Sequence, residues 1–386
     1  MGQTGWKSGA RIAPLVVTGL LAFGALAACG SDSGGTGGSD TGGSGGSGGT
    51  SEAAGGKVGV ILPDATTSPR WEANDKPSLE KAFGDAGIEA DIQNAQGNVD
   101  NFGKICDSMI NEKVDVIMIV NLDSDSGKAC LDKATAVGIL SIDYDRLTLG
   151  GGAQYYVSFD NVKVGELMGQ GLETCLNTDN KTTANIAYVN GDPKDNNASL
   201  FKEGYVKALA PKIDSGDYSL VGDTSGYWDA TKAGDAIEQL LTAEKGNIDG
   251  IVSANDTMAG GIIARLRAQG LNGKVPVTGQ DASIEGLQNI LAGDQCMTVY
   301  KNTNLEAETA AKLAIALING SKEEADALVT GTVPDSVTGK DVPSVLATPE
   351  SITADTVAKV VADGFADKAE LCAGDFAKLC TQYGVK

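Results

Sequence analysis

Short apolar runs rich in β-branched residues recur along the chain from Lys57 onward, and longer segments of helical periodicity separate them. Such short runs are typical of parallel strands that are buried on both faces. Regular alternation of strand and helix over so long a chain exceeds one ordinary sheet and predicts an α/β protein with two Rossmann-like, doubly wound lobes. The strands are expected at 57–62, 115–120, 140–144, 184–189, 250–253 and 275–278, and the helices at 71–86, 99–112, 125–137, 161–176, 229–245, 256–269 and 303–319.

The N-terminal residues have the features of a signal peptide. Lys7 and Arg11 precede an apolar run that is short for a membrane span and ends in small residues. The stretch Leu26–Cys29 then resembles a bacterial lipobox, in which the cysteine thiol is acylated after cleavage. The sequence therefore predicts a lipoprotein signal peptide over 1–28 and lipidation of Cys29. The alternative is a plain secretory signal followed by a chance cysteine.

Residues 29–56 consist mainly of Gly, Ser, Thr and Asp behind that cysteine. A segment of this composition cannot bury a core, so it is expected to act as a flexible tether. The folded part would then be held at the extracytoplasmic face of the cell membrane through its lipid anchor alone.

Composition excludes several classes of function. The formal net charge is −21 and no basic cluster is visible, which argues against nucleic acid as a partner. The chain has no histidine, which excludes Ser-His-Asp and Cys-His catalysis and His-ligated metals. No metal-binding spacing or nucleotide motif is present either. We therefore expect no catalytic residue, no metal and no cofactor.

An even number of cysteines follows Cys29, and in an exported chain this predicts disulfides. Cys106 and Cys130 would join neighbouring helices of one lobe. Cys372 and Cys380 would close a short loop near the C-terminus. The pairing of the two remaining cysteines, Cys175 and Cys296, stays open at this point.

Polar and aromatic residues follow many of the predicted strands, at the ends where open α/β sheets bind ligands. Aspartate accepts hydrogen bonds, Arg and Lys donate them, and Asn does both, so together they can satisfy the hydroxyl groups of a sugar. The apolar face of a pyranose ring packs on an indole. These features predict a monosaccharide site. The candidate residues are Arg70, Trp71, Asp145, Arg146, Asp195, Asn197, Trp228, Asn255, Asp281 and Lys301.

Each candidate also has a purely structural interpretation. A single Trp is more often a core residue than a ligand contact, and Asn255 or Asp281 would serve equally well as a helix N-cap. Asp145 and Arg146 would serve as structural ion-pair partners, and Lys301 as a solvated surface charge. The site hypothesis depends on all of them lying on the same side of their strands.

The same residues lie in stretches that resemble the periplasmic sugar-binding proteins of pentose/hexose ABC importers, and among these the D-xylose-binding type. The resemblance runs from about Lys57 to about Gly364. It implies a type I periplasmic binding protein in which the ten candidates above contact the sugar, with the two tryptophans stacking on its faces. The matching stretches are Arg70-Trp71, Asp143–Arg146, Tyr156–Asn161, Asp195–Ala198, Asn255-Asp256, Gly279–Ala282 and Met297–Lys301.

The resemblance also implies a domain division, because the family has three crossovers between its lobes. The N-terminal lobe would be 57–160 plus 302–330, and the C-terminal lobe 161–297 plus 331–386. Three features depart from the family: the segment 65–69, the cysteines, and the tail that begins at Phe365.

The expected function is that of an ABC importer's solute-binding protein: a monomer that closes on a monosaccharide, D-xylose first among them, and presents it to the permease subunits. Glucose, arabinose and ribose stay open, as does a sensory role. A second hypothesis is an exported carbohydrate-acting enzyme with Asp145 and Asp195 as acid and base. A third, a transcription regulator of the same fold, would need a helix-turn-helix head where the signal peptide lies.

Overall fold

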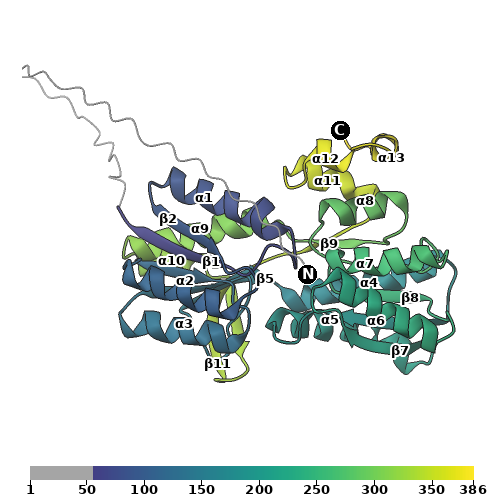
Figure 1. Cartoon of the computed structure of the whole chain (residues 1–386), viewed down its shortest axis with the longest axis horizontal. Coiled ribbons are helices and arrows are strands. Elements are labelled where there is room, and N and C mark those ends of the chain that lie inside the picture. The colour runs from purple at the N-terminus through teal and green to yellow at the C-terminus, as the bar shows by residue number, and fades with distance from the viewer. Residues whose placement is uncertain (1–54) are drawn as a thin grey trace, which may run out of the picture. The chain divides into compact units, whose positions relative to one another are not determined.

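The computed structural model describes residues 55–386, so the predicted signal peptide, Cys29 and nearly all of the tether lie outside the described residues. Within this range the fold is α/β with two mainly parallel sheets, as predicted (Figure 1). The first lobe contains a seven-stranded sheet in the order β10-β11-β5-β4-β3-β1-β2. Its strands are β1 (Lys57–Leu62), β2 (Glu89–Asn94), β3 (Val116–Ile119), β4 (Leu140–Tyr144), β5 (Tyr155–Phe159), β10 (Gly331–Asp335) and β11 (Lys340–Ala347).

Helices cover both faces of this sheet, which explains why nearly every residue of its central strands β3, β4 and β5 is buried. Phe83 and Leu313 are buried in the core on one face, and Phe102 and Leu131 are buried in a separate core on the other. The first lobe is therefore doubly wound. Its helices are α1 (Lys76–Asp85), α2 (Val99–Asn111), α3 (Ser124–Ala136), α9 (Thr303–Ile318) and α10 (Lys322–Leu328), and a π-helical turn, η1 (Trp71–Asp75), precedes α1.

The second lobe contains a three-stranded parallel sheet in the order β7-β6-β8. The strand expected at 275–278 is reduced to a single bridge between Ile251 and Val277. The sheet is formed by β6 (Ala184–Asn190), β7 (Tyr218–Ser225) and β8 (Gly250–Ser253), with helices α4 (Asn161–Thr178), α5 (Asn196–Asp214), α6 (Ala230–Ala243), α7 (Asp256–Ala268) and α8 (Ile284–Ala292).

The chain passes between the lobes three times: after β5, between β9 (Thr298–Tyr300) and α9, and between β11 and β12 (Glu350–Ile352). The assignment of all of 331–386 to the second lobe is wrong, because β11 pairs in parallel with β5 and β10 pairs with β11. Pairing with β11 covers the edge of β5 and buries Val345 in the first lobe's core. The third crossover therefore follows Ala347.

The C-terminal tail packs on the second lobe through α11 (Val357–Ala362), α12 (Lys368–Leu371) and α13 (Phe376–Gln382), which share a hydrophobic core with α8 (Figure 1). The structure pairs Cys106 with Cys130 and Cys372 with Cys380, as predicted. It also pairs the two cysteines left over, so that Cys175 of α4 is bonded to Cys296 just before β9.

Candidate functional site

A cavity between the two lobes is lined by every residue that the sequence proposed. Its empty volume is about 320 Å³, including solvent at its mouth. The lining residues are Thr67, Ser68, Arg70, Trp71, Asp145 and Arg146 from the first lobe, Asp195, Asn197, Phe201, Trp228, Asn255, Gln280 and Asp281 from the second, and Lys301 from the crossover after β9.

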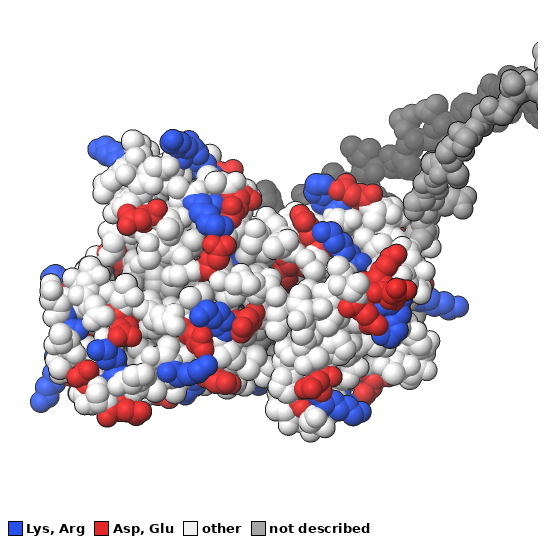
Figure 2. All heavy atoms as spheres, turned by 180° about the vertical axis from the view of Figure 1, so that it is seen from behind, with Lys and Arg blue, Asp and Glu red and all other residues white. Residues whose placement is uncertain are grey.

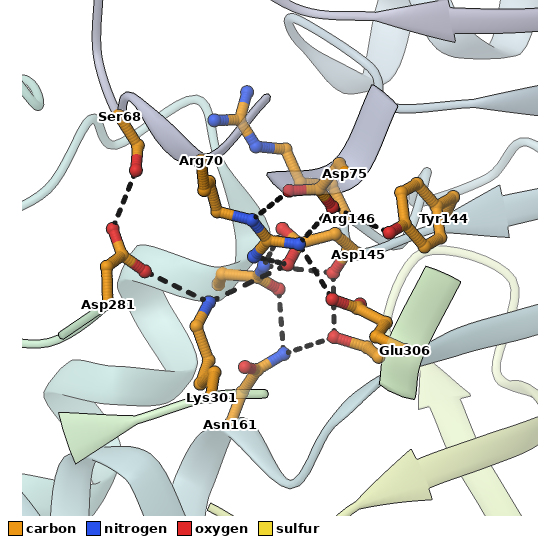
Figure 3. A network of polar contacts seen from close by, with 12 residues as sticks. Ser68, Arg70, Asp75, Tyr144, Asp145, Arg146, Asn161, Asp281, Lys301 and Glu306 are labelled. Carbon is orange, nitrogen blue, oxygen red and sulfur yellow. Dashed lines mark hydrogen bonds and ion pairs between the residues drawn. The ribbon is translucent and has the colours of Figure 1, made fainter. Parts of the chain in front are cut away.

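Arg70 is the most constrained of these side chains (Figure 3). Its Nε and Nη2 donate to the two carboxylate oxygens of Asp75 at 2.9 and 2.7 Å, and Nη1 donates to Asp145 Oδ2 at 2.7 Å. Nη2 also donates to Glu306 Oε2 at 2.7 Å. Burial lowers the pKa of Arg70, but these carboxylates outweigh it and raise the pKa well above its usual range. The guanidinium is therefore charged and fixed before any ligand arrives.

The remaining cations of the cavity connect the two lobes. Arg146 Nε lies 2.9 Å from Asp195 Oδ2, and this pair joins the loop after β4 to the start of α5. Lys301 Nζ lies 3.6 Å from Asp145 Oδ2 and 3.6 Å from Asp281 Oδ1. The charged groups of the two lobes therefore complement each other across the cavity.

Asp145 holds an unusual backbone conformation at the centre of this network. Its φ is 60°, in the left-handed region that side chains rarely adopt. Its carbonyl oxygen accepts hydrogen bonds from Tyr156, Ser158 and the Nδ2 of Asn197, at 2.9, 2.9 and 3.0 Å. Left-handed residues of this kind cluster at ligand sites where the surroundings fix them. Trp228 and Asp281 also have positive φ, at 59° and 101°.

The two tryptophans are buried in the cavity wall rather than exposed, at 2% for Trp71 and 6% for Trp228. The guanidinium of Arg70 lies 4.3 Å from the Trp71 ring centroid. The Trp228 ring packs edge-on against Phe201 at 6.2 Å and lies directly over Gly191, where a Cβ would come within 2.0 Å of the indole. Neither indole N–H has a partner among the described residues.

Several second-lobe residues fulfil the structural role and the site role at once. Asp195 caps α5 by accepting from Asn197 N, and its other carboxylate oxygen faces Arg146. Asn255 caps α7 through Met258 N. The N-cap interpretation of Asn255 was therefore right, but it was incomplete. A capping residue at a strand end also points into the cavity.

A first-lobe loop forms one wall of the cavity. Asp64 accepts hydrogen bonds from the backbone N–H groups of Thr66 and Thr67, which fixes the loop conformation. Ser68 Oγ donates to Asp281 Oδ2 at 2.9 Å, and Asn255 Nδ2 donates to the carbonyl of Thr67 at 3.2 Å. The segment 65–69, which departs from the family pattern, therefore bridges the two lobes.

The two carboxyl groups of the enzyme hypothesis lie in different electrostatic environments. Burial raises the pKa of Asp145, but the Arg70, Lys301 and Arg146 charges outweigh it and lower that pKa to about 2. Burial raises the pKa of Asp195, and Arg146 acts to lower it. Each carboxyl group is paired with an arginine, Asp145 with Arg70 and Asp195 with Arg146.

Sequence reasoning missed four lining residues and the layer behind them. Gln280 stands next to Asp281, so the strand-end pattern could have found it, and Phe201 lies one helical turn after Asn197 in α5. Glu306 and Asp75 contact the lining residues of the cavity through Arg70. In the sequence, Glu306 is an acidic residue near the start of the predicted helix 303–319, and Asp75 lies inside the predicted helix 71–86. No local pattern distinguishes such residues.

The chain matches the family model of the periplasmic binding protein domain over residues 58–322. It is 37% identical to the D-xylose-binding periplasmic protein of Escherichia coli, across 82% of this chain and 92% of that protein. The chain belongs to the periplasmic sugar-binding proteins. It is also 32% identical to the multiple sugar-binding periplasmic receptor ChvE of Rhizobium radiobacter, across 82% of this chain and 92% of the receptor.

A solved structure agrees with this membership. The carbohydrate transporter solute-binding protein of Chloroflexus aurantiacus, in complex with D-glucose, superposes with a TM-score of 0.73 at 28% identity, covering 81% of this chain and 97% of that one. The periplasmic sugar-binding proteins are non-catalytic solute-binding proteins that act outside the cytoplasm, so the enzyme hypothesis is set aside.

Two further observations concern the described range. Among residues 55–386, no helix is both long and apolar enough to cross a bilayer. Within the same range, no group of three or more acidic or cysteine side chains is arranged to hold a metal ion. On the face shown in Figure 2, acidic and basic residues are interspersed rather than gathered by sign.

Proposed function

We propose that this periplasmic sugar-binding protein binds D-xylose in the cavity between its lobes and delivers it to an ABC importer. The observation that carries the proposal is the convergence of all ten predicted side chains on one cavity between the lobes. The 37% identity to a D-xylose-binding periplasmic protein supports this choice of sugar.

The donors and acceptors of the cavity match the chemistry of a sugar. Asp145, Asp195 and Asp281 supply acceptors, while Arg70, Arg146 and Lys301 supply charged donors; Asn197 and Asn255 supply both. The buried indoles of Trp71 and Trp228 supply apolar faces for the C–H groups of the ring. Their unpartnered N–H groups are further donors that a ligand or water can satisfy.

Binding is coupled to closure of the lobes in this proposal. Cavity residues from both lobes contact the same ligand, so the sugar binds the closed form more tightly than the open form. Arg146 with Asp195, and Ser68 with Asp281, form only when the lobes are together. The closed surface is then the form that the permease subunits recognise.

Calorimetric titration with D-xylose, D-glucose, L-arabinose and D-ribose tests the proposed sugar. We expect D-xylose to bind tightest, with Trp71→Ala and Trp228→Ala each weakening it. If D-glucose, the ligand of the C. aurantiacus structure, binds more tightly, the proposed sugar changes from D-xylose to D-glucose and the proposed closure mechanism is unaffected. No response to any aldose would overturn the proposal.

The site of action is proposed to be the extracytoplasmic face of the cell membrane, through acylation of Cys29. The lipobox-like stretch Leu26–Cys29 and the Gly/Ser-rich tether behind it support this anchor. Labelled palmitate should enter the wild-type protein, and Cys29→Ala should remove the label and release the protein to the medium. A wild-type protein that is secreted without label would contradict the anchor.

A further inference from the structure

Glu306 is in contact with the charged network of the cavity although it does not line the cavity itself (Figure 3). It lies in the first turn of α9, which follows the second crossover, and is 1% exposed. Its Oε2 accepts from Arg70 Nη2 at 2.7 Å. Neither the strand-end pattern nor the family resemblance pointed to this residue.

The charges around Glu306 do not balance. The groups that face it are Arg70 from the loop before η1, Asp75 from η1, Tyr144 of β4, Asp145 after β4, Tyr156 of β5, and Lys301 after β9. Arg70 and Lys301 are the cations, and Asp75, Asp145 and Glu306 are the carboxyl groups; Lys301 is also shared with Asp281. Full ionisation would leave buried negative charge without a partner, which is strongly unfavourable. At least one carboxyl group is therefore expected to hold a proton.

The hydrogen bonds indicate which carboxyl group this is. Asp75 accepts twice from Arg70 and once from the Tyr144 hydroxyl at 2.6 Å. Asp145 accepts from Arg70 and from Asn197 Nδ2 at 3.1 Å. Glu306 accepts only once, and its Oε1 is buried with no partner among the described residues. A carboxylate with one acceptor bond is the least stabilised of the three.

The electrostatic environment agrees with this assignment. Burial raises the pKa of Glu306, Arg70 acts to lower it, and Asp145 and Asp75 act to raise it. Together these effects bring the pKa to about 8. By contrast, the neighbouring cations outweigh burial and hold the pKa of Asp145 near 2. The proton at neutral pH therefore resides on Glu306.

We propose that Glu306 is a positioning residue, which orients the Arg70 guanidinium as a neutral carboxylic acid, and that closure of the lobes on the sugar is coupled to uptake of its proton. This inference rests on the proposed function. On opening, Asn197 and Asp195 of the second lobe move away from Asp145 and Arg146 of the first. Water then reaches Asp145 and Arg70 from that side. Water screens the charges and makes ionised Glu306 less costly, so the carboxyl group is more acidic in the open form.

The sign of the pH effect follows from this difference. With the lobes together, Glu306 holds the proton up to a pH of about 8, while in the open form it releases the proton at lower pH. Sugar affinity is therefore highest in mild acid and falls as the pH rises toward 8. Because one proton is involved, the affinity falls by at most about tenfold per pH unit, and it levels off above pH 8.

The test is a Kd profile from pH 6 to pH 9.5 for the wild type, Glu306→Gln, Glu308→Gln and Asp256→Asn. Glu306→Gln imitates the neutral acid, so it should retain the wild-type Kd at pH 6 within about threefold and lose the alkaline weakening. Glu308, two residues along α9 and exposed, is the matched charge control and should leave the profile unchanged. Burial also raises the pKa of Asp256 to about 7, so Asp256→Asn shows whether that group causes the effect instead.

A second measurement applies even where Glu306→Gln does not fold. Calorimetry of the wild type at pH 7.5, in buffers of different ionisation enthalpy, should show net proton uptake on sugar binding. A wild type that binds no aldose would overturn the proposed function and, with it, this inference. Sugar binding that is tight but pH-independent, or a weakening abolished by Asp256→Asn and not by Glu306→Gln, would overturn this inference alone.

Discussion

The two halves of the cavity are held in different ways. On the first-lobe half, Arg70 is fixed by Asp75, Asp145 and Glu306, all side chains of the same lobe. On the second-lobe half, two of the polar groups are fixed by backbone N–H groups: Asp195 and Asn255 cap the helices that they precede.

This difference teaches which kind of change each half tolerates. A network of buried charges fails when one partner is removed, because the other charges are left uncompensated. A capping residue loses one or two hydrogen bonds of ordinary strength when it is replaced. Removing a charge should therefore harm the first-lobe half far more than the second.

The largest effect is expected for Arg70→Met. It leaves the buried carboxylate of Asp75 without a cation, which costs about 3–5 kcal/mol. We expect the melting temperature to fall and sugar binding to be lost at concentrations that saturate the wild type. Asn255→Ala on the other half should cost about 1 kcal/mol of stability through its cap. Equal thermal losses for the two variants would contradict the comparison.

A second prediction concerns the backbone support of the second-lobe half. Gly191→Ala places a Cβ within 2.0 Å of the Trp228 indole, so the ring must move. Overpacking of this kind costs about 1–3 kcal/mol, and we expect about thirtyfold weaker sugar binding at 2 kcal/mol. Gly103→Ala, in α2 with open space around it, is the control and should leave the Kd unchanged. Unchanged binding by Gly191→Ala would mean that the Trp228 position is unimportant.

The disulfides allow the stability of the lobes to be compared. Cys106–Cys130 closes 24 residues in the first lobe, and Cys175–Cys296 closes 121 in the second. In the chain-entropy model, replacing the second pair by serines should cost about 1.4 kcal/mol more than replacing the first. Chemical denaturation of the two double variants measures this difference. A larger loss from the first pair would show that packing, rather than loop length, dominates.

The smallest effect is expected for Ser68→Ala, which removes a hydrogen bond between the lobes. One such bond contributes about 1 kcal/mol, so sugar affinity should fall about fivefold while the melting temperature changes little. Ser78→Ala is matched to it, because Ser78 Oγ bonds Asn304 within the first lobe. If Ser78→Ala weakens the sugar as much, the Ser68 bond has no specific part in closure.

The sequence by itself indicated the α/β fold class and ten of the fourteen residues that line the cavity. Short apolar runs that alternate with helices are typical of parallel strands covered by helices, and the polar residues just after those runs lie at one edge of each sheet. Asp195, Asn255 and Asp281 were identifiable for that reason. They carry their signal in the residues immediately beside them, whatever the rest of the chain does.

Tertiary structure alone decided the rest. Arg70 and Glu306 are 236 residues apart, and Ser68 and Asp281 are 213 apart. Such contacts leave no periodicity or spacing in the sequence. The same holds for β11, whose pairing with β5 depends on a free sheet edge. Local sequence indicates where the cavity-lining residues lie; the return of α9 to the first lobe brings Glu306 to Arg70 and sets the charge balance around the cavity.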